Sequence, residues 1–257
     1  MSKTWITIDG MEVDYQVIPG LLDRFNLLPN FLRNLIELKN TNNIKINKEQ
    51  QINYFKKFLL DNNIKDKDQL SKWLMSNGLD DKRLDLLLYE KLKIERFKFN
   101  KFDNEVDKIF LDQKILFDQV IYYVLKVEKQ AAALELYTQL EEKESTFAEL
   151  ASKYSLGSEK DLNGQVGPVE YRYIYDEIRE RLLISKQGQL WPPFSIKNYW
   201  YILRHEKNIP CKLDDVMRKR IRDKLYEEWI NKKVLKFIKI IRNIQDKEEN
   251  LASNVSN

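Results

Sequence analysis

Four stretches of this chain decide how it folds: Thr146-Phe-Ala-Glu-Leu-Ala-Ser-Lys-Tyr-Ser155, Asn163-Gly-Gln-Val-Gly167, Gly188-Gln-Leu-Trp-Pro-Pro-Phe194 and Asn198-Tyr-Trp-Tyr-Ile-Leu-Arg204. The first has the spacing of a capping box, which predicts that a helix begins there. The glycines of the second favour a tight turn before a short strand over 165–169. The last two predict a strand, a turn and a closing strand.

The hydrophobic period changes on either side of these stretches. Residues 120–127 are mostly β-branched or aromatic, which predicts a strand with Ile121, Tyr123, Leu125 and Val127 on one face. Helical periods follow over 128–142, from residue 146 onward, and over 174–184. This part of the chain therefore predicts a mixed α+β unit.

The first part of the chain has helical periodicity. Residues 1–20 are predicted to form a short extended arm that ends at Pro19-Gly20. One helix is expected to stop at Asn77-Gly78, and another to start at once, capped by Asp80. A further helix fits residues 103–117. We therefore expect a mainly helical region before the α+β unit.

The end of the chain predicts one long helix after Pro210, from about Asp214 to Arg242. The end of this helix is basic. An acidic client would bind such a surface, but the commoner explanation is a solvated helix end whose cations lie near the negative pole of the helix dipole. The predicted division of the chain is 1–117, a helical domain; 118–207, the α+β domain; 208–245, a helix packing on the helical domain; and 246–257, a disordered tail.

Composition limits the class of protein. With 44 Lys and Arg against 40 Asp and Glu, the net charge of +4 is too small to predict nucleic-acid binding. No apolar run approaches the length of a membrane span, so no membrane insertion is expected. The first residues lack the apolar stretch of a secretory signal, and the single cysteine excludes an internal disulfide. These features predict a cytoplasmic protein.

Reactive groups are few. One histidine, His205, and one cysteine, Cys211, cannot build a structural zinc site, so neither a metal nor another cofactor is expected. Their spacing, with a proline between them, gives no support for a thiol nucleophile. The glycines near residue 165 are not followed by the lysine and serine of a phosphate loop.

The order and spacing of the four stretches resemble those of a parvulin-type peptidyl-prolyl isomerase domain over residues 118–206. That resemblance implies a four-stranded antiparallel sheet wrapped by helices, which is the order that the hydrophobic periods predict independently. The helical region before the domain and the long helix after it are similar in organisation to the flanks of SurA-like and PpiC-type foldases. There such helices form a chaperone body.

The resemblance also implies where a site would lie. In active members of the family, two histidines face each other across the site beside a cysteine or aspartate. These positions match Tyr123, Trp200 and Gly157, so all three polar groups are replaced. The two aromatics either stack on a peptide proline or simply fill the space of the histidines. The residues expected to bind peptide are Tyr123, Leu156, Ile174, Ile178, Leu190, Phe194 and Trp200.

These observations predict a parvulin-family foldase that binds unfolded or proline-containing polypeptide, with weak or lost isomerase activity. The alternative is a non-catalytic adaptor or assembly subunit that has closed the groove and binds one specific protein. A nucleic-acid binder is disfavoured by the balanced charge. The client and the oligomeric state do not follow from the sequence.

Overall fold

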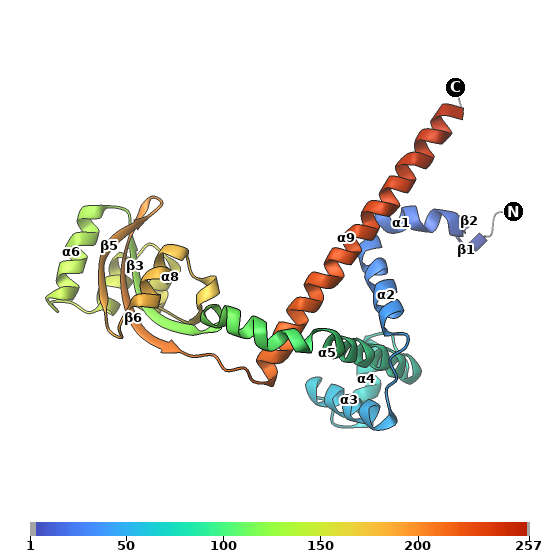
Figure 1. Cartoon of the computed structure of the whole chain (residues 1–257), viewed down its shortest axis with the longest axis horizontal. Coiled ribbons are helices and arrows are strands. Elements are labelled where there is room, and N and C mark those ends of the chain that lie inside the picture. The colour runs from blue at the N-terminus through green and yellow to red at the C-terminus, as the bar shows by residue number, and fades with distance from the viewer. Residues whose placement is uncertain (1–3, 256–257) are drawn as a thin grey trace. The chain divides into compact units, whose positions relative to one another are not determined.

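The computed structural model describes residues 4–255, which fall into two compact units (Figure 1). Unit 1 holds the described residues up to Val106 and those from Arg218 onward, and unit 2 is Asp107–Met217. Each unit has a hydrophobic core of its own. Within the described residues, none of the helices combines the length and apolar composition needed to cross a membrane.

Unit 2 is built on a four-stranded antiparallel sheet, as the sequence predicts. Its strand order is β4-β3-β6-β5, so the first and last strands of the unit, β3 and β6, pair at the centre. The strands are β3 (Gln119–Val127), β4 (Gln165–Glu170), β5 (Leu190–Ile196) and β6 (Tyr199–Ile209). The helices are α6 (Gln130–Glu141), α7 (Phe147–Tyr154) and α8 (Asp176–Ile184).

Both faces of this sheet are covered. Consecutive side chains of a strand point to opposite faces, so β3 supplies two cores at once. We call the face of the sheet that α8 covers the α8 face. Tyr122 and Val124 are buried there with Leu203. On the face that α6 and α7 cover, here the α6/α7 face, Leu125 and Val127 are buried. The sheet is thus the middle of three layers.

The predicted face of β3 is confirmed for Tyr123, Leu125 and Val127, which all pack on the α6/α7 face. Ile121, predicted to join them, is not part of that core. The pairing of β3 with β6 shifts register between Ile121 and Tyr122. The alternation of β3 continues through this point, since Val120, Tyr122 and Val124 are all buried in the core of the α8 face, and Ile121 is half-buried outside the α6/α7 core.

The predicted turn before β4 contains Gly164, at φ +81°, and Gly167 lies within β4 itself. Gly167 has φ +106°, and a Cβ atom there would lie 2.3 Å from the backbone oxygen of Val120. Since that contact is with backbone, only glycine lets β4 approach β3 so closely. The capping box at the start of α7 is also confirmed, with Thr146 Oγ1 accepting from the backbone N–H of Glu149 at 3.2 Å.

Unit 1 is mainly helical. A two-stranded hairpin precedes four helices, after which come most of α5 and most of α9. These elements are β1 (Thr4–Ile8), β2 (Met11–Asp14), α1 (Ile18–Arg24), α2 (Leu28–Thr41), α3 (Lys48–Asp61), α4 (Lys67–Ser76), α5 (Asp81–Phe117) and α9 (Asp215–Val255). α4 ends at Ser76 with Asn77 as its C-cap, and Asp80 Oδ1 accepts from the backbone N–H of Arg83 at 2.7 Å, both as predicted.

The expected extended arm over residues 1–20 differs from the structure. Residues 4–14 form a hairpin, and Pro19 lies in the first turn of α1 rather than at the end of an arm. Proline is favoured in the first helical turn because its missing N–H has no partner there in any case. Residues 1–3 lie outside the described part of the chain.

The two longest helices exceed their predicted lengths. The sequence predicted separate helices before Phe117, whereas α5 is one helix of 37 residues. Likewise α9 runs through Val255, although a helix to about Arg242 and a disordered tail over 246–257 were expected. Neither segment contains Gly or Pro, so nothing in the backbone stops either helix. Residues 256–257 are outside the described range.

In unit 1, α2, α5 and α9 share one core. Leu32 of α2, Phe102 of α5 and Ile230 of α9 are buried together, with Tyr226 only 1% exposed. The C-terminal helix therefore packs on the helical domain, as the sequence predicts. A smaller core joins the start of α5 to α3 and α4.

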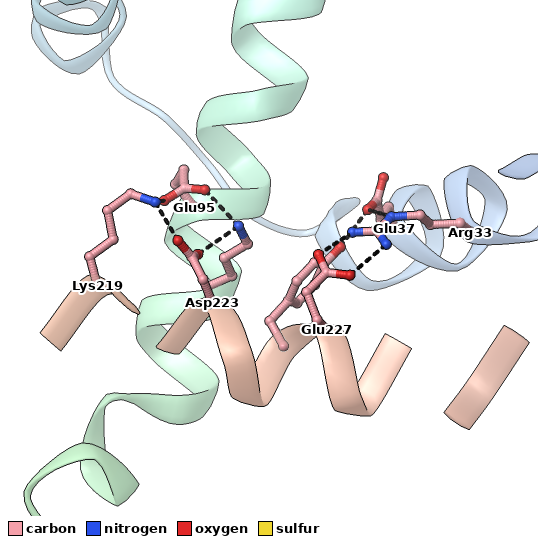
Figure 2. Close-up of polar contacts among 8 residues, drawn as sticks. Arg33, Glu37, Glu95, Lys219, Asp223 and Glu227 are labelled. Atoms are coloured by element: carbon pink, nitrogen blue, oxygen red, sulfur yellow. Dashed lines mark hydrogen bonds and ion pairs between the residues drawn. The ribbon is translucent and has the colours of Figure 1, made fainter. Parts of the chain in front are cut away.

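Two linked groups of charges border this core (Figure 2). Arg33 of α2 donates from both terminal nitrogens to Glu227 of α9, at 2.8 and 2.6 Å, and from Nε to Glu37 at 3.1 Å. Tyr226 donates its hydroxyl to Glu37. Because the carboxylate of Glu227 stabilises the charged guanidinium, it raises the pKa of Arg33.

The second group joins α5 to α9. Lys98 Nζ donates to Asp223 at 2.9 Å and to Glu95 at 2.8 Å, and Lys219 pairs with Asp223 as well (Figure 2). The side chain of Lys98 is 13% exposed, and the ammonium also lies 4.8 Å from the centre of the Tyr226 ring. These contacts satisfy charges that would otherwise be desolvated without a partner.

Candidate functional site

The structure divides the seven predicted peptide-binding residues. Ile174, Ile178 and Phe194 belong to the core of the α8 face. Tyr123, Leu190 and Trp200 pack instead against the core of the α6/α7 face. Leu156 follows α7 and is 54% exposed. The predicted residues therefore do not line one groove, because the sheet lies between two of the sets.

Tyr123 and Trp200 also do not lie opposite each other on the sheet. In the β3–β6 ladder Tyr123 pairs with Arg204, while Trp200 pairs with Val127 at the other end of β3. The guanidinium of Arg204 lies over the Tyr123 ring, 4.5 Å from its centre. In this register Tyr123 and Trp200 are too far apart along the strands to stack on each other or to contact one proline together.

Two neighbouring tyrosines occupy the α8 face instead. Tyr122 is buried in the same core as Ile174 and Ile178, and Tyr201 packs against that core. Each lies one residue from a predicted site position, and a one-residue slip in a strand moves a side chain to the other face. The alternation of Val120, Tyr122 and Val124 as buried residues of β3 is the signal that identifies this face.

We call Tyr122, Tyr201, Ile174, Ile178, Phe194 and Glu159 the Tyr122 site. Tyr201 stacks on Phe194 with ring centres 6.1 Å apart and 24° between planes. The guanidinium of Arg181 lies 3.8 Å from the centre of the Phe194 ring. The exposed fractions are 6% for Tyr122, 6% for Ile174, 3% for Ile178 and 8% for Phe194. The apolar floor of this site is therefore covered by the chain itself.

An acidic side chain lies beside the third predicted position. Gly157 has no side chain, but the carboxylate of Glu159 is within 2.5 Å of where its Cβ would be. Ser155 Oγ, buried, donates to Glu159 Oε1 at 2.6 Å and accepts from the backbone N–H of Lys126 at 3.0 Å. These bonds hold the carboxylate next to β3.

Charge and burial act on both tyrosines of the site. Burial, and then the charge of Glu159, raises the pKa of Tyr122 to about 12. Burial also raises the pKa of Tyr201, with Tyr175 and Glu159 adding to the effect. Both hydroxyls therefore stay protonated near neutral pH and are hydrogen-bond donors rather than bases.

The histidine of the chain pairs with Tyr122 in the β3–β6 ladder, and both of its ring nitrogens already have partners. His205 is 2% exposed; its Nδ1 lies 3.2 Å from the backbone oxygen of Lys186 and its Nε2 lies 3.0 Å from Asn208 Oδ1. Burial raises the pKa of the Cys211 thiol, which disfavours a reactive thiolate. Among the residues that the structure describes, no group of three or more His, Cys, Asp or Glu side chains is placed to hold a metal ion.

Comparison with known proteins agrees with this architecture. Residues 125–207 match the family model of the PPIC-type PPIase, or rotamase, domain. No curated protein matches the chain. The peptidylprolyl isomerase PrsA of Bacillus cereus is similar in structure, with a TM-score of 0.50, 16% identity, and 91% of this chain and 92% of that chain covered. PrsA of Bacillus anthracis gives a TM-score of 0.44 and 19% identity, with 80% and 94% covered.

At such identities the structural likeness shows a shared fold, and the family match is limited to unit 2. The predicted strand order, the capped helix α7 and the glycine turn before β4 all lie within or beside the matched residues. On this evidence, residues 125–207 belong to the parvulin-type, or PPIC-type, family of rotamase domains.

Proposed function

We propose that this chain is a foldase or chaperone of the parvulin family that binds polypeptide clients and has weak or no prolyl isomerase activity. The family of residues 125–207 and the fold shared with a PrsA protein support the foldase class. Within the described residues, the helical region of unit 1 offers exposed apolar surface suited to unfolded chains. The covered Tyr122 site supports weak or absent catalysis.

The single observation that carries the proposal is the burial of the apolar floor of the Tyr122 site. A proline ring needs apolar side chains that it can reach. Ile174, Ile178 and Phe194 are each at most 8% exposed, and Arg181 and Tyr201 lie over Phe194. A peptide would have to displace these side chains before its proline reached the floor.

The chemistry of the site supports the same conclusion. Rotation about an X–Pro bond crosses a barrier of roughly 20 kcal/mol, and a thousandfold acceleration requires about 4 kcal/mol of selective stabilisation. Such stabilisation normally comes from donors aimed at the twisted amide in a dry site. Tyr122 is a protonated donor, but it is buried among apolar side chains. Its hydroxyl is therefore poorly placed to meet a peptide.

Unit 1 supplies a surface for clients. Between α3 and α5 a groove of about 490 Å³ has mainly apolar walls, including Ile52, Phe55 and Leu88. A non-polar groove of this size binds apolar side chains of an extended polypeptide by removing them from water. This part of the proposal does not require proline in the client.

A measurement of aggregation tests client binding. The full chain is titrated into a chemically unfolded, aggregating protein, and light scattering is followed. Ile52→Ser places a polar side chain in the groove. The matched control is Leu60→Ser, which lies on the same helix but outside the groove, at a position that is 77% exposed. We expect suppression by the native chain and by L60S, with weaker suppression by I52S. No suppression by the native chain at any ratio would contradict the proposal.

The filled Tyr122 site also favours a second candidate, an adaptor that binds one folded partner. A peptide array separates the two functions. Binding to many extended apolar or proline-containing peptides supports the foldase, whereas silence across the array with one tight partner in a pull-down supports the adaptor. Preference for proline and the expected cytoplasmic location stay predictions.

A further inference from the structure

A second cavity lies in unit 2 on the α6/α7 face, away from the Tyr122 site. Its volume is about 700 Å³, within the range of pockets that hold small molecules or peptide side chains. We call it the Arg204 pocket. The residues that line it are Tyr123, Tyr137, Leu140, Glu141, Lys143, Ser145, Thr146, Phe147, Ala148, Gly188, Leu190 and Arg204.

The walls of this pocket are largely aromatic and aliphatic. The rings of Tyr123 and Phe147 lie 5.5 Å apart at 50° to each other. Leu140 and Leu190 add aliphatic surface, and both are only partly buried against the core of this face. A ring or a branched aliphatic side chain that enters the pocket would be removed from water on several sides.

One cation is fixed against these aromatic walls. The guanidinium carbon of Arg204 lies 4.5 Å from the centre of the Tyr123 ring and 5.5 Å from that of Phe147. Glu206 Oε2 lies 3.7 Å from Arg204 Nη2, which makes an ion pair but is too far for a hydrogen bond, and the buried Nε–H of Arg204 makes no hydrogen bond within the described residues. The guanidinium therefore has hydrogen-bonding capacity that the protein leaves unused.

Among the lining side chains cations outnumber carboxylates, and Glu206, which pairs with Arg204, lies outside the lining. Lys143 adds a second positive charge, and Glu141 is the acidic residue among the lining side chains. Glu141 Oε1 already accepts a hydrogen bond from the Tyr137 hydroxyl at 3.0 Å. The balance of charge in the pocket favours an anion.

We propose that the Arg204 pocket binds a carboxylate attached to an aromatic or large aliphatic group. This is the chemistry of the last residue of a polypeptide with an apolar side chain, and also of a free aryl-alkanoic acid. A guanidinium packed against two aromatic rings loses rotational freedom, and its planar fork of donors suits a bidentate carboxylate. The apolar walls lower the local dielectric and strengthen that pair. The site is independent of the Tyr122 site and of aggregation suppression.

Binding of a labelled peptide to the full chain tests the pocket. The probe is a short peptide that ends in phenylalanine with a free carboxylate, and its control has the same sequence with a C-terminal amide. Fluorescence anisotropy gives both affinities. We expect the amide to bind at least about tenfold more weakly, since it lacks the charge that pairs with Arg204.

Three variants locate the binding. Arg204→Gln removes the cation and Ala148→Trp fills the cavity, and each should weaken binding of the acid peptide by about tenfold or more. Lys207→Gln removes an exposed charge from the same strand outside the pocket and should leave the affinity unchanged. Circular dichroism melts establish that each variant is folded.

Competition identifies the source of the carboxylate. If 3-phenylpropionate displaces the peptide at similar concentration, the pocket takes small aryl-alkanoic acids; if only the peptide binds, it takes polypeptide ends. Either result supports the proposed chemistry. Equal affinity for acid and amide peptides, or full affinity in both folded R204Q and folded A148W, would overturn it. Absence of binding of the acid peptide and of 3-phenylpropionate would also overturn it.

Discussion

The carboxylate of Glu159 lies where a side chain on residue 157 would begin: a Cβ atom on Gly157 would be 1.9 Å from Glu159 Oε2. In active relatives, by the resemblance described above, the position of Gly157 carries a cysteine or aspartate. Here the glycine leaves room for an acidic group from two residues further along. The Tyr122 site therefore combines two tyrosines and a carboxylate.

This relationship predicts a coupled effect of two substitutions. Gly157→Ala must displace the Glu159 carboxylate and break its 2.6 Å bond from the buried Ser155 hydroxyl. We expect a loss of about 1–3 kcal/mol in the free energy of unfolding. In a Glu159→Ala background the same change should cost much less, because the obstacle is gone. Urea unfolding of the four proteins gives the coupling energy, and strictly additive losses would contradict the account.

The raised pKa of Tyr122 predicts how the free energy of unfolding changes at alkaline pH. Its pKa is raised to about 12 from an ordinary value of 10.0, so the folded chain holds the phenolic proton more tightly than the unfolded chain. Its contribution to stability is therefore intact below about pH 10 and falls as the pH rises toward about 12. The full difference corresponds to roughly 3 kcal/mol.

Tyr122→Phe should remove this dependence. We expect the free energy of unfolding to fall less steeply with pH in Y122F than in the native chain, between about pH 9 and about pH 12. Tyr171, whose pKa burial also raises to about 12, is present in both proteins and serves as background. Parallel profiles for the two proteins would show that Tyr122 is not the titrating group.

The close pairing of β4 with β3 predicts unequal costs for two glycines. Gly167→Ala places a Cβ 2.3 Å from the Val120 backbone oxygen at φ +106°, whereas Gly188, at φ +79°, has open space around its Cβ position. We expect G188A to lose about 1 kcal/mol from backbone strain alone, and G167A to lose at least about 3 kcal/mol because strand pairing is disturbed as well. Equal losses in thermal or urea unfolding would mean that β4 moves freely.

The charge network of unit 1 predicts a stability effect for Tyr226. Tyr226→Phe removes a hydroxyl that donates to Glu37 from a side chain 1% exposed (Figure 2). We expect a loss of about 1–3 kcal/mol, as for a buried hydrogen bond to a charged group. Lys224→Gln breaks a 3.9 Å pair with Glu228 in which both side chains are at least half exposed, and should change stability little. A harmless Y226F would contradict this view of the network.

The fold of unit 2 was largely predictable because its signals are local. The capping box at Thr146 and Glu149 and the glycine turn after Asn163 each depend on a few neighbouring residues. The lengths of α5 and α9 were not predictable in the same way. Each is long because nothing stops it and neighbouring helices cover its apolar stripe, and the second condition depends on tertiary packing.

The site was harder to predict, because the role of a strand residue depends on which face of the sheet its side chain lies on. Tyr122 and Tyr123 are adjacent, yet they lie on opposite sides of the sheet, and the same holds for Trp200 and Tyr201. An alignment shifted by one residue changes the apparent site completely. Nothing in the sequence indicated Glu159 either, because its position depends on the space that Gly157 leaves and not on a motif.

Catalysed isomerisation of a proline peptide tests the central claim most directly. The rate of cis–trans exchange is measured by NMR with and without the full chain, beside an active parvulin domain at the same concentration. The buried floor of the Tyr122 site, and the partners that both ring nitrogens of His205 already have, predict an acceleration below about tenfold, or less than roughly 1.4 kcal/mol of the barrier. Turnover equal to that of the active domain would contradict the account, since the covered site would then have to open and catalyse.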